Sequence, residues 1–486
     1  MNQKIISLKL LIISCICVFA SCISQKKISE SIKEIQVNLV PAFVINGIDS
    51  KPLILKDGMK KYKVPAVSMA FFDNGKIQWT KSYGTISNNS TKLVNDHTLF
   101  QAASISKPVT ALGVMKLAQE GEVVLNENIN KYLKNWSLQN EDYKESEKAT
   151  LHNLLSHTGG MNASWSDGYK LGSNLPSLLQ ILNGESPATS KRVLQETTAG
   201  SKWKYSNGGY VIIQKLIEDV SGDLFENFMQ KEILTPIGMT SSSFSQNLSK
   251  PLKDNVAFGH DGEGQVVEGN WRIYPEQAAA GLWTTPSDLA LFAISLQKAY
   301  TAESQKIVNK KTMHAMLKRQ LGDWGLGIDI SNRDNVLRFM HGGANEGYRC
   351  HLVAEANLGQ GVVIMTNGVG GETLIQDLLR GFSKNYGWNI YKPREKNTIP
   401  ISTTQKEKLI GKYFMVDNKQ VIVEISNTEK GLKVMQTWNG QSYQIFAEKR
   451  LDFFRETDGV SIDFKENEEG KIIEFLAGGE LLFKKS

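Results

Sequence analysis

The chain has 486 residues, of which 41% are hydrophobic and 22% charged, and its formal net charge is +6 at pH 7. This composition is typical of a globular protein with a large core, and the length suggests two or three domains. The positive charge is spread along the chain without runs of lysine and arginine or interleaved aromatic residues, so we expect no nucleic-acid partner.

The first residues have the pattern of a secretory signal. Two lysines precede an apolar run over 10–20, which is shorter than the roughly 20 residues that a membrane-spanning helix needs. The run ends in small residues, and Ala20-Ser21-Cys22 resembles a bacterial lipobox. We expect a signal peptide over 1–21 and lipidation of Cys22, which makes the protein a periplasm-facing lipoprotein of the bacterial cell envelope. Phe19 stands where leucine is usual, so a soluble periplasmic or secreted protein is the alternative.

The polar, lysine-rich stretch over 22–38 suits a tether, and the membrane is expected as a partner only through the lipid anchor. A folded domain is expected over 39–390. It opens with apolar runs over 67–72 and 76–80 around Asp73-Asn74-Gly75, and this pattern predicts a β-hairpin.

The most informative segment begins at Ser104-Ile105-Ser106-Lys107. The residues over 108–120 predict a helix that is apolar almost all round and ends at Gly121, so we expect a buried central helix. Residues three apart lie on one helix face, which brings Lys107 within reach of the Ser104 hydroxyl. A lysine kept neutral by burial can take the serine proton, and the helix N-terminus favours the negative charge that then develops. S-x-x-K is the nucleophile motif of β-lactamases and penicillin-binding proteins.

Two further motifs follow. Tyr205 and Asn207 stand in a glycine-bounded loop that can hold the tyrosine hydroxyl over a nucleophile. Tyrosine serves as a base only if cations lower its pKa from about 10, and Lys107 is such a cation. His341-Gly342-Gly343-Ala344 precedes an apolar run over 350–354 that predicts a strand, and its small residues let the strand backbone approach a substrate closely.

The order of the remaining elements predicts an α+β fold. Helical and irregular sequence fills 104–320, strand-like runs return at 325–330 and 361–367, and a helix is predicted over 372–386. We therefore expect an antiparallel sheet built from both ends of the domain, flanked by helices, with a helical insert.

The pattern changes beyond residue 390. Pro393 and Pro400 mark a linker over 391–403. The following residues, 404–486, alternate short apolar runs with turns, which predicts a small all-β barrel or sandwich without a catalytic constellation.

The three motifs in this order resemble the serine hydrolases of the class C β-lactamase superfamily, which includes penicillin-binding proteins, D-amino-acid peptidases and esterases. The resemblance covers roughly residues 40–390 and extends to the segments 150–161 and 279–289. It implies a β-lactamase/transpeptidase-like fold, and the all-β segment resembles the lipocalin-like tail of some members.

The resemblance implies acyl transfer through a covalent ester on Ser104. Lys107 and Tyr205 together take the serine proton, and the sequence leaves open which of them is the base. Asn207 orients the substrate and Lys107, and the backbone N–H groups of Ser104 and Ala344 hold the oxyanion. The substrate strand is 341–344, with His341, Gly342 and Gly343 where the family has K-T-G or a variant.

His341 is the departure from the family pattern. A lysine would hold a substrate carboxylate, whereas histidine, with an ordinary pKa of about 6.5, is largely neutral at pH 7. We therefore favour an esterase or a D-amino-acid amidase/peptidase acting on a small-molecule or peptide substrate. A β-lactamase or D-Ala-D-Ala carboxypeptidase is the first alternative, and a non-catalytic penicillin-binding-like sensor lipoprotein is the second. If His341 binds carboxylates as imidazolium, preference for them rises below about pH 6.5.

The sequence lacks the motifs of metal, nucleotide and α/β-hydrolase sites. The chain has no H-E-x-x-H, C-x-x-C, P-loop or G-x-S-x-G, so we expect no metal, no cofactor and no α/β-hydrolase site. His157 is expected to be a structural hydrogen-bonding residue. Cys350 is expected to be a buried strand residue that has no disulfide partner if Cys22 carries lipid. The sequence does not indicate an oligomeric state.

Overall fold

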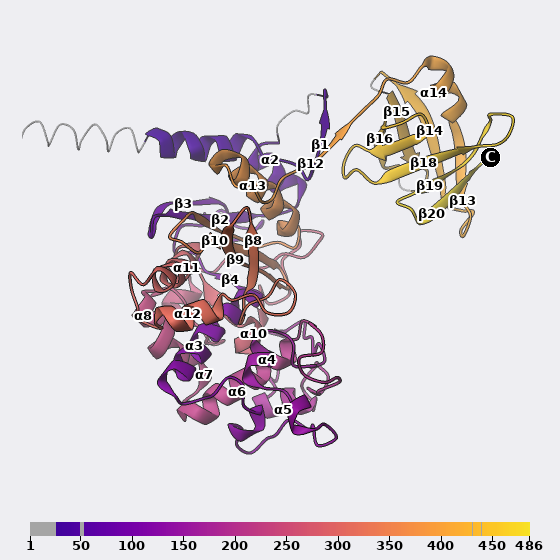
Figure 1. The fold of residues 1–486 in the computed structure, drawn as a ribbon. Coiled ribbons are helices and arrows are strands. Elements are labelled where there is room, and N and C mark those ends of the chain that lie inside the picture. The colour runs from indigo at the N-terminus through magenta and orange to yellow at the C-terminus, as the bar shows by residue number, and fades with distance from the viewer. Residues whose placement is uncertain (1–25, 49–52, 430, 439) are drawn as a thin grey trace, which may run out of the picture. The chain divides into compact units, whose positions relative to one another are not determined.

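The computed structural model describes residues 26–48, 53–429, 431–438 and 440–486. The predicted signal peptide and the predicted lipidation site, Cys22, lie outside these residues. The chain divides into two compact units, shown in Figure 1. Of the described residues, one unit comprises 26–33 and 55–375, and the other comprises 34–48, 53–54, 376–429, 431–438 and 440–486. Within the described residues, no helix is long and apolar enough to cross a membrane.

The first unit is built on a six-stranded antiparallel sheet with the strand order β3-β2-β11-β10-β9-β8. Its strands are β2 (Ala66–Asp73), β3 (Lys76–Gly84), β8 (Asp329–Arg333), β9 (Val336–Asn345), β10 (Tyr348–Glu355) and β11 (Gly361–Thr366). Because β2 pairs with β11, strands from both ends of the unit lie in one sheet. The predicted α+β fold with an antiparallel sheet is confirmed.

The predicted hairpin forms as β2 and β3. Asn74 and Gly75 have φ of 50° and 67°, the left-handed pair that a two-residue hairpin turn requires. The strand predicted over 325–330 is wrong for most of its length, because β8 begins only at Asp329. Gly327 has φ of +89°, and a Cβ on it would lie 2.3 Å from the Ala111 Cβ. The chain therefore bends against the central helix at this point instead of extending.

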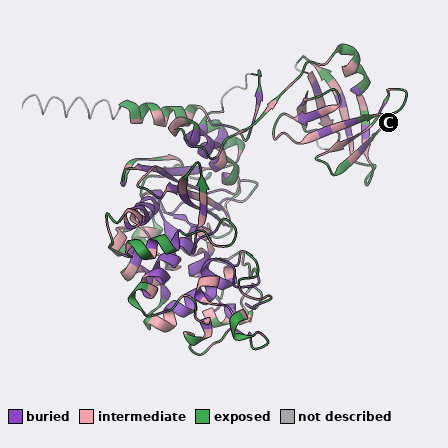
Figure 2. Ribbon diagram, in the orientation of Figure 1, coloured by how far each residue is buried: buried purple, intermediate pink, exposed green. Residues whose placement is uncertain are grey.

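Helices fill the insert and cover the sheet. The central helix, α3 (Ser106–Glu120), is buried along most of its length and ends at Gly121 with φ of 82°, as predicted (Figure 2). Another long helix, α11 (Pro286–Thr301), packs against β2, β3 and β11. The other helices of this unit are α2 (Leu55–Lys61), α4 (Leu151–Leu155), α5 (Leu178–Asn183), α6 (Asn207–Ser221), α7 (Phe225–Met229), α8 (Thr235–Ile237), α9 (Lys250–Lys253), α10 (Gln277–Ala280) and α12 (Lys310–Met316).

Short elements complete the unit. The short helical segments are the 3-10 helices η1 (Ala103–Ile105), η2 (Ile129–Lys131) and η3 (Glu145–Glu147) and the π-helix η4 (Gln230–Leu234). Two small antiparallel pairs are β4 (Phe100–Gln101) with β7 (Trp283–Thr284) and β5 (Tyr169–Lys170) with β6 (Arg272–Ile273).

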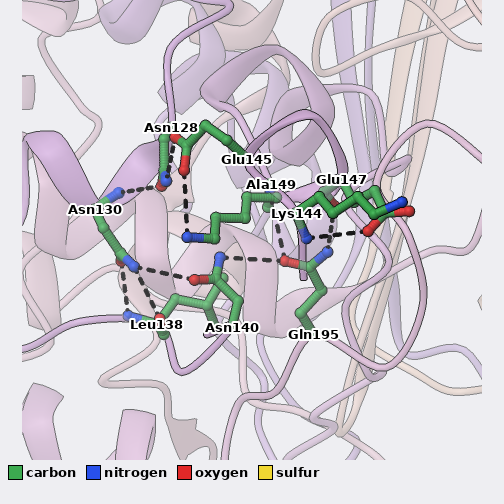
Figure 3. A network of polar contacts seen from close by, with 10 residues as sticks. Asn128, Asn130, Leu138, Asn140, Lys144, Glu145, Glu147, Ala149 and Gln195 are labelled. Carbon is green, nitrogen blue, oxygen red and sulfur yellow. Dashed lines mark hydrogen bonds and ion pairs between the residues drawn. The ribbon is translucent and has the colours of Figure 1, made fainter. Parts of the chain in front are cut away.

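A network of amide side chains ties the irregular segment before α4 to the rest of the insert (Figure 3). The Asn130 amide nitrogen donates to the Leu138 carbonyl at 2.9 Å, and the Asn140 amide nitrogen donates to Gln195 Oε1 at 3.3 Å. Gln195 also accepts from the Ala149 N–H, one residue before the cap of α4. Hydrogen-bonded polar groups favour a unique conformation, so this network holds the segment 130–149 against the segment that carries Gln195.

The second unit contains a closed barrel of eight strands, β13 to β20. Its strands are β13 (Gly411–Met415), β14 (Ile422–Thr428), β15 (Gly431–Gln436), β16 (Ser442–Ala447), β17 (Asp452–Arg455), β18 (Ser461–Glu466), β19 (Ile472–Ala477) and β20 (Leu481–Lys485). Aromatic rings including Tyr413, Phe453, Phe464 and Phe475 belong to its buried core. The predicted all-β C-terminal domain is confirmed as a barrel with a packed interior.

Residues from the N-terminal side of the chain also belong to the second unit. Strand β1 (Phe43–Asn46) pairs in parallel with β12 (Arg394–Asn397), and the Phe43 ring lies 5.3 Å from the Phe454 ring, edge to face. The helices of this unit are α14 (Thr403–Leu409) and most of α13 (Gly371–Tyr386), which begins in the first unit.

The structure divides the chain differently from the predicted boundaries. The described residues 39–48, 53–54 and 376–390, placed by prediction in the hydrolase domain, group with the barrel. Residues 26–37, predicted as a tether, are helical, and the predicted linker over 391–403 contains strand β12. The physical reason for the second difference is pairing: β12 finds its partner in β1, so the segment 391–403 is not a free connection.

Candidate active site

Ser104 stands at an exposed point of an otherwise buried segment. It lies in η1, directly before α3, and it is partly exposed, whereas the residues over 98–103 and 105–115 are all buried. The preceding Ala103 has φ of 49°, a left-handed conformation that is uncommon for a residue with a side chain. Such strain persists only where the surroundings hold it.

Two contacts hold that backbone. The Ala102 N–H donates to the Leu282 carbonyl at 2.8 Å, and the Cys350 thiol donates to the Ala102 carbonyl at 2.9 Å. Burial raises the pKa of Cys350, so the thiol remains a donor. Cys350 is a buried strand residue, as expected, and its hydrogen bond lies two residues from the predicted nucleophile.

Lys107 is fully buried and points its amine at Ser104. Its Nζ lies 3.1 Å from Ser104 Oγ and donates to the Ala279 carbonyl at 2.7 Å. Burial lowers the pKa of Lys107 well below its ordinary value, because a charged amine loses its hydration there. The nearby Ser106 hydroxyl is buried and accepts from the Leu282 N–H at 3.0 Å, so its oxygen is already engaged.

Tyr205 faces the same point, and Asn207 lies two residues further along the chain. Tyr205 is hydrogen-bonded to Ser104, and Lys107 Nζ lies 5.0 Å from the centroid of its ring. Burial raises the pKa of Tyr205 above its ordinary value of 10, so the phenol keeps its proton. Asn207 begins α6, donates its N–H to the Ala163 carbonyl at 3.0 Å, and has a buried Oδ1 without a hydrogen-bond partner in the described part of the chain.

His157 supports the tyrosine loop. Its Nδ1 accepts the Ser206 N–H at 3.2 Å, and its ring centroid lies 4.4 Å from that of Tyr205. Burial lowers the pKa of His157 well below 6.5, so the imidazole is neutral. The structure confirms the expected role of this residue as a structural hydrogen-bonding partner and shows that it acts on the Tyr205 segment.

Strand β9 has an open side next to this group. Pairing with β8 ends at Met340, whereas pairing with β10 continues to Asn345. The Leu337 carbonyl accepts from Ala356 on the β10 side, and successive residues of a strand point to alternate sides. The N–H groups of Gly342 and Ala344 therefore face the side that β8 leaves open, as an oxyanion donor at Ala344 requires.

Gly343 lies where only glycine fits. A Cβ on it would lie 2.3 Å from the Ala102 carbonyl oxygen and 2.4 Å from Cys350 Sγ. The small residues of this strand were predicted to let a substrate approach. At Gly343, however, the strand backbone lies close to the Ala102 carbonyl, just before the predicted nucleophile. The absence of a side chain at Gly343 therefore lets β9 pack against η1.

His341 is buried and neutral. Its Nδ1 lies 2.5 Å from the Gly342 carbonyl oxygen, and burial lowers its pKa to about 3. The expectation that this residue titrates near pH 6.5 is therefore wrong, because the buried imidazolium would lose its hydration. A carboxylate finds no cation at position 341 between pH 5 and 8.

This neutrality makes a prediction for the variant His341→Lys. In the wild type, the ratio of kcat/KM for esters with and without a terminal carboxylate should stay constant from pH 5 to 8. A hydrogen bond to a charged group contributes roughly 1.5–3 kcal/mol, so the variant should shift that ratio toward carboxylate esters by about 10- to 100-fold. One ester series assayed on both proteins measures it. Equal ratios in the two proteins would mean that position 341 does not recognise substrate charge.

Sequence reasoning missed two groups of the site. The Ala279 carbonyl, which accepts from Lys107, is a backbone atom without a side-chain signal of its own, although its segment, 279–289, resembles the family. Trp324 lies with its ring centroid 5.4 Å from that of His341 and 6.0 Å from that of Tyr205. A lone tryptophan in a loop gives no indication of such a position.

The described residues include no group of three or more histidine, cysteine, aspartate or glutamate side chains that could hold a metal ion. The site itself offers a hydroxyl beside a buried amine, a protonated phenol, and a strand edge with N–H groups that β8 leaves open.

The fold and the grouped motifs define the serine β-lactamase-related superfamily. Residues 53–382 match the family described as Beta-lactamase, and the chain belongs to that family. Its members include penicillin-binding proteins and AmpC-like proteins, which are serine hydrolases.

Individual proteins show the same likeness. Penicillin-binding protein 4* of Bacillus subtilis (strain 168) is 22% identical over 420 residues, which cover 81% of this chain and 88% of that protein. The octameric penicillin-binding protein homologue from Pyrococcus abyssi superposes with a TM-score of 0.59 at 21% identity, over 88% of this chain and 98% of that one. D-alanine carboxypeptidase AmpC from Burkholderia cenocepacia gives a TM-score of 0.53 at 19% identity, over 68% and 99%. At these identities the structural matches show the fold.

Proposed function

We propose that this protein is a serine hydrolase that acylates Ser104, and that it acts on esters or on amides of D-amino acids. The observation that carries the proposal is the buried Lys107 amine, which lies 3.1 Å from Ser104 Oγ and has its pKa lowered by burial. A neutral amine at this distance can accept the serine proton as the hydroxyl attacks a carbonyl carbon.

The opposite pKa shifts of the two candidate bases favour one of them. Lys107 has a lowered pKa and is available as a base, whereas Tyr205 has a raised pKa and holds its proton. Lys107 therefore takes the Ser104 proton. Tyr205 is hydrogen-bonded to Ser104, and it passes a proton to the leaving atom while it is resupplied from Lys107. The sequence had left this choice open.

The remaining steps use the strand edge. The carbonyl oxygen of the substrate gains negative charge between the N–H groups of Ser104 and Ala344, the bond to the leaving group breaks, and an ester on Ser104 remains. Water then attacks that ester, giving its proton to the Lys107–Tyr205 pair, and the acid leaves as Ser104 regains its hydrogen.

The neutral His341 supports the choice of substrate. A β-lactam or a D-Ala-D-Ala peptide carries a carboxylate, and the position that would hold it has no charge here. A neutral ester or amide needs no cation at this position and so loses no binding interaction there. We therefore favour esterase or D-amino-acid amidase/peptidase activity over β-lactamase or carboxypeptidase activity.

Intact-mass spectrometry with three substrate panels tests the proposal. Esters, D-amino-acid amides and β-lactams are each mixed with the protein, and both turnover and the mass of the protein are followed. Turnover of esters or amides with a transient adduct on Ser104 supports the proposal. A lasting β-lactam adduct without turnover of any panel favours the sensor alternative, and absence of any adduct contradicts acyl transfer.

We also propose that the protein is a lipoprotein that faces the periplasm, on the basis of Ala20-Ser21-Cys22 after a short apolar run. Stable anchoring takes more than one lipid chain. Cys22→Ser should therefore move the protein to the soluble fraction with unchanged activity per molecule. Fractionation and the mass of the mature N-terminus measure this outcome, and a variant that stays with the membrane contradicts lipidation.

A further inference from the structure

Two tryptophans lie beside the catalytic tyrosine. The ring centroid of Trp203 lies 6.5 Å from that of Tyr205 and 5.6 Å from that of Trp324. Trp324 in turn lies 6.0 Å from Tyr205 and 5.4 Å from His341, edge to face in both cases. The four rings form one continuous aromatic surface, which we call the aromatic wall: Trp203, Tyr205, Trp324 and His341.

The aromatic wall is buried at its inner end and open at its outer end. His341 is 5% exposed and Trp324 is 9% exposed, whereas Trp203 is 40% exposed. The indole nitrogen of Trp324 is buried and has no hydrogen-bond partner among the residues that the structure describes. An exposed indole continuous with a reactive centre offers apolar contact area that the folded chain itself does not use.

The mechanism places the leaving group on this side. Tyr205 must deliver a proton to the leaving atom, so that atom comes within hydrogen-bond reach of the Tyr205 hydroxyl. The substituent on the leaving atom therefore extends from Tyr205 over its neighbours, and the neighbours of Tyr205 with exposed ring surface include Trp203.

The charges around the wall favour an uncharged substituent. Burial keeps His341 and His157 neutral, because it lowers the pKa of both. Lys204, next to Trp203 in sequence, is engaged in an ion pair with Glu196 at 2.6 Å. A flat apolar group would contact Trp203 and Trp324, whereas a carboxylate placed there would lose hydration without gaining a buried cation.

We propose that Trp203 and Trp324 form the leaving-group subsite and that this subsite takes an apolar, uncharged aromatic leaving group. The proposal rests on the proposed acyl-transfer function and specifies its substrate class: esters or amides whose alcohol or amine part carries an aromatic ring.

Acetate esters that differ only in their alcohol test the subsite. Methyl acetate, benzyl acetate and 4-carboxybenzyl acetate share one acyl group, so differences in kcat/KM report on the leaving-group side. The wild type should prefer benzyl acetate to both of the others. Trp203→Ala should lower kcat/KM for benzyl acetate by about 10-fold and change that for methyl acetate by less than about twofold, and Trp203→Phe should restore most of the loss.

Trp165→Ala is the matched control. Trp165 is another exposed indole, at 55% exposure, and its Nε1 donates to Asp167 at 2.8 Å. The control should keep the wild-type preference. A preference for benzyl acetate that survives Trp203→Ala, or an equal loss in Trp165→Ala, overturns the subsite.

If a variant folds poorly, the kcat/KM values of the wild type alone still test the subsite. Equal kcat/KM for benzyl and methyl acetate, with a normal acetyl adduct on Ser104, overturns the subsite and leaves the proposed function intact. Absence of the acetyl adduct with every ester overturns both, and the mass of the protein distinguishes the two results.

Discussion

Ser104→Ala should lower kcat for any substrate by at least about 1,000-fold, because the variant has no oxygen with which to form the acyl-enzyme. The fold should survive, since Ser104 is partly exposed and its hydroxyl makes no contact that the core depends on. A fluorophosphonate probe with intact-mass readout measures the result: one adduct on the wild type and none on the variant.

Ser106→Ala is the control for this prediction. Its hydroxyl accepts from the Leu282 N–H at 3.0 Å, so the substitution should cost about 1 kcal/mol of stability and leave the adduct on Ser104 in place. Labelling that follows Ser106, or turnover that persists in Ser104→Ala, would remove the nucleophile assignment.

Lys107→Met should abolish acylation and at the same time stabilise the protein. The variant loses the base, so kcat should fall by roughly the same factor as in Ser104→Ala, and the double variant should be scarcely worse than either single one. Burial lowers the pKa of Lys107 in the folded state, whereas the unfolded lysine keeps an ordinary pKa of about 10.4. Between those two values the unfolded state binds more protons, so the free energy of unfolding of the wild type rises with pH.

The pH dependence of stability gives the readout. One such group contributes a slope of about 1.4 kcal/mol per pH unit. Urea denaturation should show that the free energy of unfolding rises more steeply between pH 7 and pH 9 in the wild type than in Lys107→Met, with the variant more stable at pH 7. The same slope in both proteins would mean that Lys107 is charged when folded, and a variant that still acylates Ser104 would exclude it as the base.

Elements that depend on the local conformational preferences of their residues could be predicted from the sequence. The apolar run 108–120 ended by Gly121 predicted α3, because no other residue adopts a left-handed helix end so easily. Asp73-Asn74-Gly75 predicted the turn of the first hairpin for the same reason. The three motifs of the candidate site could be recognised because each consists of chemically distinctive side chains at fixed spacing.

Contacts made by ordinary residues could not be predicted. Lys107 donates to the carbonyl of Ala279, 172 positions away, and an alanine carbonyl has no distinctive sequence signal. The pKa of His341 depends on burial, which arises only when β9 packs against η1. The hydrogen bond of Lys107 and the low pKa of His341 can therefore be recognised only in the tertiary structure.

The tether shows how composition can mislead. Ile28, Ile32 and Ile35 have the i, i+4, i+7 spacing of one helix face, and residues 26–37 are helical with Ile35 buried. The many lysines and glutamates between them favoured a solvated connection. Periodicity was the better indicator, because charged side chains occupy the outer face of such a helix without disturbing it.

The parallel pair of β1 with β12 has a consequence for biosynthesis. Asn46 and Asn397 are hydrogen-bonded neighbours in the folded protein, yet they are 351 positions apart in the chain. At roughly 5–20 residues per second, a ribosome needs about 20–70 s to make the second strand after the first has emerged. During that interval Phe43 and Ile45 lack the Phe446 and Phe454 rings of their cluster, while the whole sheet of the first unit is being completed. A chaperone that shields apolar strands would act on this N-terminal segment, and a chain cut at Pro393 would leave it exposed permanently.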